Sequence, residues 1–125
     1  MLTISHPWPD DVDYHSMGQV KCLMDKEKRA IYFSRHPIPF SREAYQAQSK
    51  AKADLHVGVY GYTLEALTRF CVNDPCEMEK TEGLEQLRAL YLGMRIDVIQ
   101  GKIKSGISYR GIDTQEDLDW ARSFK

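Results

Sequence analysis

The strongest constraint on the fold is the run LHVGVYGY at Leu55–Tyr62, in which successive residues alternate between two sides. A period of two is typical of a β-strand, and it puts His56 and Tyr60 on the same face. That face is polar and aromatic, which makes it a candidate wall of a binding site. Ordinary half-buried strand residues would give the same pattern, and taken alone the two residues favour this simpler interpretation.

Strand and helix signals flank this run on both sides. Val20–Met24 and Ala30–Ser34 are rich in β-forming residues and enclose a short charged connection, which predicts a hairpin. After the alternating run, Thr63 is placed to cap a helix. A second helix is expected over about 79–92, with Gly93 as its C-cap glycine.

The rest of the chain completes a mixed α/β pattern. Strands are expected over 95–99 and 107–112, and a last helix begins at Asp113 or Thr114. The polar segment 41–52 fits either a short exposed helix or a loop. The first nineteen residues carry little periodic signal, and the prolines at 7 and 9 predict an extended or turning segment over 6–11. The fold class is therefore α/β, with helices covering a mixed sheet.

Length and composition narrow the class of protein. The chain has 125 residues, which suits a single domain over 1–125. Its 17 basic and 18 acidic residues disfavour a strongly basic nucleic-acid-binding protein. Neither a signal peptide nor an apolar run long enough for a membrane helix is visible. Three cysteines at unrelated spacings predict reduced thiols and a cytoplasmic location.

No single motif in the chain is a catalytic signature. Four sequence blocks, taken together and in their order, are specific enough to indicate a family. They are YFSRHPIPF (32–40), HVGVYGY (56–62), EKTEGLEQLRAL (79–90) and GIDTQEDL (111–118). In order and spacing they resemble the C-terminal half of the 3-deoxy-manno-octulosonate (Kdo) cytidylyltransferases, also called CMP-Kdo synthetases. These transferases join Kdo to CMP from CTP and release pyrophosphate, a step in lipopolysaccharide biosynthesis.

The resemblance implies the C-terminal half of a nucleotide-diphospho-sugar-transferase-like fold, the part that binds the sugar acid and supplies much of a homodimer contact. Family members are about twice as long. Their N-terminal half carries the basic, glycine-rich loop for the CTP phosphates, and no such loop occurs in this chain. The expectation is a truncated nucleotidyltransferase that is inactive alone, because the CTP-binding half is missing.

Asp113 matches the second of the two aspartates that hold Mg²⁺ in the family. The resemblance therefore implies that Asp113 is a catalytic metal ligand and that Mg²⁺ is the cofactor. Magnesium ions take one or two protein carboxylates together with substrate oxygens, which suits this position. The alternative is that Asp113 only caps the last helix, and the residue by itself favours that interpretation. The surrounding GIDT-x-EDL motif favours the metal ligand.

The resemblance also assigns residues to the sugar acid. Arg35 and Arg42 match positions near its carboxylate, and guanidinium groups suit such a partner. For Arg42 a solvated surface position is equally acceptable, since its neighbours are polar.

Four further residues match the motifs that contact the sugar hydroxyls. They are His56, Tyr60, Glu85 and Gln86. An exposed helix face is the alternative for the last two. Arg88, next to them, is expected to pair structurally with a nearby carboxylate.

Three functions remain open at this point. The chain is one half of a split cytidylyltransferase that works with CTP and a Kdo-like acid once a nucleotide-binding half is supplied. Alternatively, it is a non-catalytic module for sugar-acid binding or dimerisation. The third possibility is a family remnant or fragment. Acylneuraminate cytidylyltransferases do similar chemistry, so the identity of the acid sugar also stays open.

Overall fold

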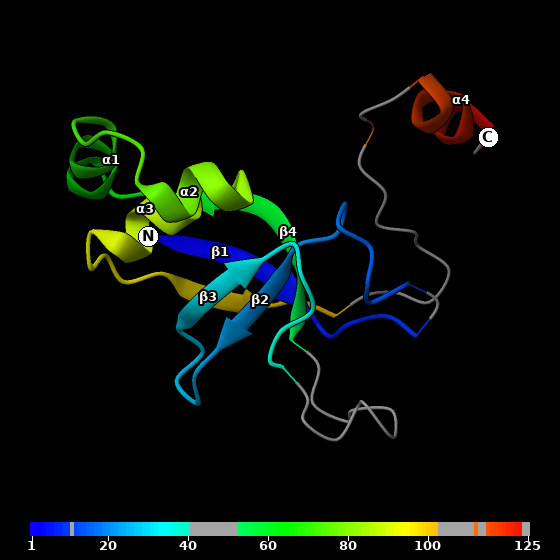
Figure 1. The fold of residues 1–125 in the computed structure, drawn as a ribbon, viewed down its shortest axis with the longest axis horizontal. Helices are drawn as coiled ribbons and strands as arrows, with labels where there is room; N and C mark the ends of the chain where they lie inside the picture. The colour runs from blue at the N-terminus through cyan, green and yellow to red at the C-terminus, as the bar shows by residue number, and fades with distance from the viewer. Residues whose placement is uncertain (11, 41–52, 103–111, 113–114, 124–125) are drawn as a thin grey trace.

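Five strands form one mixed sheet in the order β3-β2-β4-β1-β5 (Figure 1). The structure is a computed structural model that describes residues 1–10, 12–40, 53–102, 112 and 115–123. The strands are β1 (Leu2–His6), β2 (Lys21–Met24), β3 (Ala30–Ser34), β4 (Asp54–Gly61) and β5 (Asp97–Gln100). β1 runs parallel to β5, whereas the other neighbouring pairs are antiparallel. The predicted α/β class and mixed sheet are confirmed.

β1 is a central strand that the periodic signal missed. It lies between β4 and β5, with Leu2 paired to Gly61 on one side and to Asp97 on the other. Its two core-facing residues are Thr3 and Ser5, which are fully buried but polar. No strand was predicted here, because the alternation at Thr3 and Ser5 is polar and gives no hydrophobic periodicity.

The predicted hairpin of β2 and β3 is confirmed, and its turn reaches β5. Lys28 adopts the left-handed conformation (φ 60°), and the Asp25 carboxylate accepts a hydrogen bond from the backbone N–H of Arg29. Beyond the turn, the backbone N–H of Val98 donates to the Lys28 carbonyl at 2.8 Å. The sheet is thus curled, so that the hairpin turn hydrogen-bonds to the strand at the far end of the sheet order.

Four helices are described: α1 (Leu64–Cys71), α2 (Glu77–Glu82), α3 (Gln86–Tyr91) and α4 (Gln115–Ser123). Thr63 caps α1 as predicted, with its hydroxyl oxygen 3.2 Å from the Ala66 backbone nitrogen. None of the described helices is long and apolar enough to cross a membrane. The expected strand over 107–112 and the segment 41–52 lie outside the described residues, apart from Ile112.

The single helix expected over 79–92 was wrong, because Gly83 divides it into α2 and α3. Gly83 has φ 62° and ψ 42°, a left-handed conformation that terminates α2. The backbone N–H groups of Gly83 and Leu84 both donate to the Glu79 carbonyl. At the end of α3, Gly93 also has a positive φ, as expected for a C-cap glycine.

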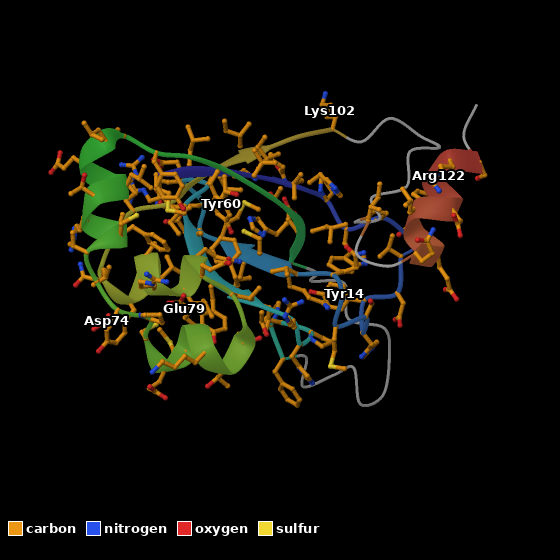
Figure 2. All side chains as sticks on the ribbon, turned by 90° about the horizontal axis from the view of Figure 1, so that it is seen from above. Tyr14, Tyr60, Asp74, Glu79, Lys102 and Arg122 are labelled. Carbon is orange, nitrogen blue, oxygen red and sulfur yellow. The ribbon has the colours of Figure 1, made fainter. Side chains whose placement is uncertain are left out.

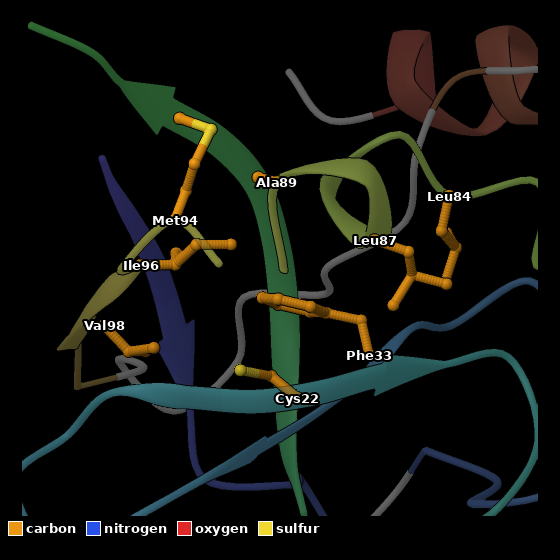
Figure 3. Close-up of a cluster of buried hydrophobic side chains, with 8 residues drawn as sticks. All are labelled: Cys22, Phe33, Leu84, Leu87, Ala89, Met94, Ile96 and Val98. Carbon is orange, nitrogen blue, oxygen red and sulfur yellow. The ribbon is translucent and has the colours of Figure 1, made fainter. Parts of the chain in front are cut away.

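The core lies between the sheet and α3 (Figure 3). Its buried members are Cys22, Phe33, Leu84, Leu87, Ala89, Met94, Ile96 and Val98. Burial raises the pKa of the Cys22 thiol to about 12, so this cysteine is an inert part of the core. The cluster holds α3 against the sheet, and α3 in turn positions Gln86.

A buried lysine organises the segment before β2. The Lys21 ammonium group donates hydrogen bonds of 2.7, 2.9 and 2.7 Å to the carbonyls of Ser16, Gln19 and Arg35. It also lies 5.2 Å from the centre of the Trp8 ring and 5.8 Å from that of Tyr14. Burial lowers its pKa. Full hydrogen bonding is what makes this burial tolerable.

Candidate functional site

A row of rings crosses the helix-covered face of the sheet. Successive ring centres lie 4.9, 5.4, 6.2 and 6.1 Å apart. The rings belong, in order, to Phe33, His56, Tyr60, Tyr62 and Phe70. Figure 2 shows Tyr60 separated along the sheet from Tyr14. The alternation of β4 therefore does what the sequence predicted and puts His56 and Tyr60 side by side on one face.

The Thr3 hydroxyl determines the tautomer of His56. Its oxygen lies 2.8 Å from the His56 Nε2 atom and donates its only proton to the Val59 carbonyl, also at 2.8 Å. A hydroxyl that has donated its proton can only accept a second hydrogen bond. His56 Nε2 must therefore carry a proton. Burial lowers the pKa of His56 to about 4, so the ring is neutral near pH 7 and its Nδ1 atom is an acceptor.

Tyr60 complements this acceptor with a hydroxyl that stays protonated. Burial is the main cause that raises its pKa, and the charge of Glu85 adds to the effect. A neutral phenol donates one hydrogen bond and also accepts. His56 and Tyr60 thus supply an acceptor and a donor on two rings whose centres lie 5.4 Å apart, which suits a ligand rich in hydroxyl groups.

Glu85 and Gln86 stand at the start of α3, next to Tyr60. Glu85 is exposed, and its charge raises the pKa values of Tyr60 and Tyr62, which indicates that it lies close to both rings. Gln86 is only 3% exposed, so the alternative of an exposed helix face was wrong for this residue. Among the described residues nothing hydrogen-bonds to the Gln86 side-chain amide. Its polar atoms are available to a ligand that enters beside α3.

A buried ion pair fixes the position of α3. Arg88 donates to both carboxylate oxygens of Glu79, at 2.7 and 2.6 Å, and to the Asn73 carbonyl at 3.0 Å. Its guanidinium carbon also lies 4.4 Å from the centre of the Phe70 ring. The hydrogen bonds from Arg88 lower the pKa of Glu79. The expectation that Arg88 pairs structurally with a carboxylate is confirmed.

Arg35 lies at the α2–α3 junction, with its guanidinium group engaged by the protein. Three of its N–H groups donate to the carbonyls of Glu82, Gly83 and Met17. Within the described part of the chain, no hydrogen bond or ion pair joins Arg35 to the other candidate residues. A guanidinium group has five N–H donors, and three of those of Arg35 are used here. The remaining two can donate to a carboxylate of a ligand.

The remaining two candidates, Arg42 and Asp113, lie outside the described residues. Among the residues that are described, no three His, Cys, Asp or Glu side chains gather into a group that could hold a metal ion. The structure brings His56, Tyr60 and Glu85 together, and Gln86 follows Glu85 in the chain at the buried start of α3. Arg35 contacts the α2–α3 junction instead. Thr3 was not predicted as a functional residue. The signal that could have identified it is the alternation of small polar residues at Thr3 and Ser5, which indicates a strand with a buried polar face.

Comparison with known proteins gives a consistent result. The family model described as cytidylyltransferase matches residues 3–96. A 3-deoxy-manno-octulosonate cytidylyltransferase of Bdellovibrio bacteriovorus is 44% identical over 119 residues, which cover 94% of this chain and 46% of that protein. The enzyme of the same name from Elusimicrobium minutum is 42% identical over 124 residues, which cover 99% of this chain and 49% of that enzyme.

The solved structures agree with the sequence comparisons. A structure of CMP:2-keto-3-deoxy-manno-octonic acid synthetase complexed with CTP superimposes with a TM-score of 0.81 at 30% identity. The match covers 98% of this chain and 47% of the solved chain. The chain thus spans about half the length of the curated relatives it matches.

Proposed function

Because this chain belongs to the cytidylyltransferases, and among them to the CMP-Kdo synthetase family, we propose that it forms the sugar-acid-binding part of such an enzyme. The reaction is CTP + Kdo → CMP-Kdo + pyrophosphate. The observation that carries the proposal is that the rings of His56 and Tyr60 lie 5.4 Å apart, with Glu85 close enough for its charge to raise the pKa of Tyr60. Gln86 follows Glu85 in the chain and is buried at the start of α3.

The chemistry of these side chains supports a polyhydroxylated ligand. His56 offers an acceptor at Nδ1, Tyr60 a hydroxyl, and Gln86 an amide that both donates and accepts. Directional groups of this kind bind sugar hydroxyls and hold the attacking hydroxyl towards the nucleotide. Arg35 and Arg42 would supply guanidinium donors to the carboxylate of the acid, as the family resemblance implies.

Asp113 is the residue through which this chain would bind Mg²⁺. Carboxylate oxygens suit that ion, which needs only one or two of them from the protein. When bound, Mg²⁺ stabilises the negative charge that develops on the phosphate oxygens. We propose that the remaining ligands come from the nucleotide and from a nucleotide-binding half, as the family resemblance implies.

Catalysis by this chain therefore requires a partner that binds CTP. We expect the 125-residue chain to be inactive alone and active once a polypeptide with the phosphate-binding loop is added. A homodimer and a cytoplasmic location belong to the same proposal. Three free cysteines in the structure support a reducing compartment.

A non-catalytic module for sugar-acid binding or dimerisation is the second candidate. It is favoured by the kind of residue that the site contains, because each described member suits hydroxyl or carboxylate groups rather than a triphosphate. The two candidates share the same site and differ only in whether turnover follows when the nucleotide-binding half is supplied.

Two measurements on the purified chain test the proposal. Isothermal titration calorimetry should detect Kdo binding that is lost in His56→Ala and Gln86→Ala and kept in Glu77→Gln, a change on the exposed face of α2. Pyrophosphate release with CTP, Mg²⁺ and Kdo should appear only after an N-terminal half of a relative is added. Robust turnover by the chain alone would contradict the requirement for a partner, and binding without any turnover would favour the module.

A further inference from the structure

A second polar cluster lies across β4, β1 and β5, and it is named here the strand-end cluster. Its members are Lys28, Gln100, Asp54 and Ser5. The Asp54 Oδ2 atom accepts hydrogen bonds of 2.8 Å from both the Ser5 hydroxyl and the Gln100 side-chain amide. The Lys28 ammonium group donates to the other side of the same amide, at Gln100 Oε1, at 2.9 Å.

Strand register puts this cluster on the face that carries His56. Ser5 pairs with His56 across the β1–β4 ladder and with Gln100 across the β1–β5 ladder, so the three side chains share one face. Asp54 precedes His56 by two residues in the same strand and therefore also shares that face. The cluster is continuous with the candidate site described above.

The position in the sheet also suits a ligand. Ser5 and Gln100 are near the carboxyl ends of the parallel strands β1 and β5. Crevices outside the carboxyl ends of parallel strands are where α/β sheets bind their ligands. Lys28 reaches this edge because the hairpin turn hydrogen-bonds to β5.

Unused hydrogen-bonding capacity distinguishes the cluster from a closed structural network. Ser5 is fully buried and holds Asp54 in place, whereas Gln100 and Lys28 are exposed and Asp54 is half-buried. Within the described residues, Asp54 Oδ1 accepts no hydrogen bond. One amide proton of Gln100 and two ammonium protons of Lys28 are likewise uncommitted.

We propose that the strand-end cluster is an additional subsite that binds hydroxyl and carboxylate groups of a polyhydroxylated sugar acid next to His56. Asp54 Oδ1 accepts from a hydroxyl, and the Gln100 amide and the Lys28 ammonium group donate to the acid. The hydrogen bond between Gln100 and Asp54 fixes a donor and an acceptor next to each other. Neighbouring polar groups on a sugar can bind such a preorganised pair without ordering it further. The inference rests on the proposed function and extends the same site.

Matched pairs of exposed residues test the subsite on the full 125-residue chain. Gln100→Met and Lys28→Met remove donors at the cluster, whereas Gln115→Met and Lys26→Met make the same changes elsewhere. Calorimetric titration with Kdo should show binding weakened about tenfold by each cluster variant, as expected for loss of a hydrogen bond to a charged group. The two control variants should bind like the unmodified chain.

Nuclear magnetic resonance of the same samples reports on individual side chains. Addition of Kdo should shift the side-chain amide signals of Gln100 and leave those of Gln115 unchanged. Asp54→Asn, checked for folding by its amide spectrum, should abolish the Gln100 shift.

The outcomes separate the two proposals. If Kdo binding depends on His56 but is unchanged in both cluster variants, with the Gln100 amide signals unmoved, the subsite is refuted and the proposed function stands. If the unmodified chain binds no Kdo at millimolar concentration, both proposals are overturned together.

Discussion

The Thr3 hydroxyl oxygen lies 2.8 Å from His56 Nε2 and has already donated its proton to the Val59 carbonyl. Thr3 therefore acts on the candidate site through His56, as a positioning residue. The contact joins β1 to β4 and leaves the Nδ1 atom of the ring as an acceptor.

Replacing Thr3 with valine should remove this control while nearly preserving the volume of the side chain. We expect the imidazole of His56 to populate both tautomers in Thr3→Val, because Nε2 has lost its acceptor. The ¹⁵N chemical shifts of the ring report the tautomer directly. Thr3→Ser keeps the hydroxyl and should restore the Nε2–H form, and failure of this rescue would argue against the assignment.

Acidification should destabilise the fold through His56. Its pKa is about 4 in the folded chain against an ordinary value of 6.5, so the unfolded chain binds the extra proton in this interval. Stability is therefore fully present above pH 6.5 and falls as the pH decreases towards 4, by about 3 kcal/mol for this residue. Urea unfolding at pH 7 and pH 4.5 measures the loss.

The matched variants for that experiment are His56→Gln and His15→Gln. The first should flatten the acid limb of the stability curve, whereas the second changes an exposed histidine and should leave the curve as it is. An equal acid sensitivity in His56→Gln would assign the effect to other groups.

Loss of one partner of the Glu79–Arg88 pair should be costly. The side chains are only 9% and 14% exposed, so Glu79→Gln leaves a buried guanidinium group without its charge partner. We expect the free energy of unfolding to fall by about 3 kcal/mol. Lys80→Met breaks the exposed pair with Glu77 on the same helix and should change the unfolding midpoint little, which thermal denaturation of both variants can show.

A side chain at Gly83 should strain the junction between α2 and α3. The backbone there has φ 62°, and alanine in that conformation costs about 1 kcal/mol. Gly83→Ala should lower the urea midpoint and weaken Kdo binding, because Glu85 and Gln86 follow the junction. Gly18→Ala is the control, since its new methyl group would meet only the Ser16 hydroxyl at 3.7 Å. Equal behaviour of the two variants would exclude strain at Gly83.

Local sequence patterns predicted the parts of the fold that short-range signals determine, such as an alternating strand or a helix cap. The alternation of β4 placed His56 and Tyr60 correctly, and Thr63 caps its helix as expected. The pattern failed at β1, where buried Thr3 and Ser5 remove the hydrophobic contrast on which strand prediction depends.

Tertiary contacts explain the remaining differences. The helix expected over 79–92 included Gly83, whose left-handed backbone instead ends α2 and separates it from α3. Buried Lys21 has no signal in the sequence, because its burial depends on the Arg35 carbonyl fourteen residues away as well as on the nearby Ser16 and Gln19 carbonyls. The strand-end cluster is equally invisible, since its members meet only after three strands and a hairpin have paired.

The place of β1 between β4 and β5 has a consequence for the order of folding. Leu2 finds its neighbours at Gly61 and Asp97, so the middle of the sheet forms from segments far apart in the chain. Such pairing requires a large loss of chain entropy before the stabilising contacts form. We therefore expect slow folding compared with helical chains of this size. During synthesis, the Thr3–His56 contact can form before the pairing of β1 with β5, which must wait until Asp97–Gln100 have been added.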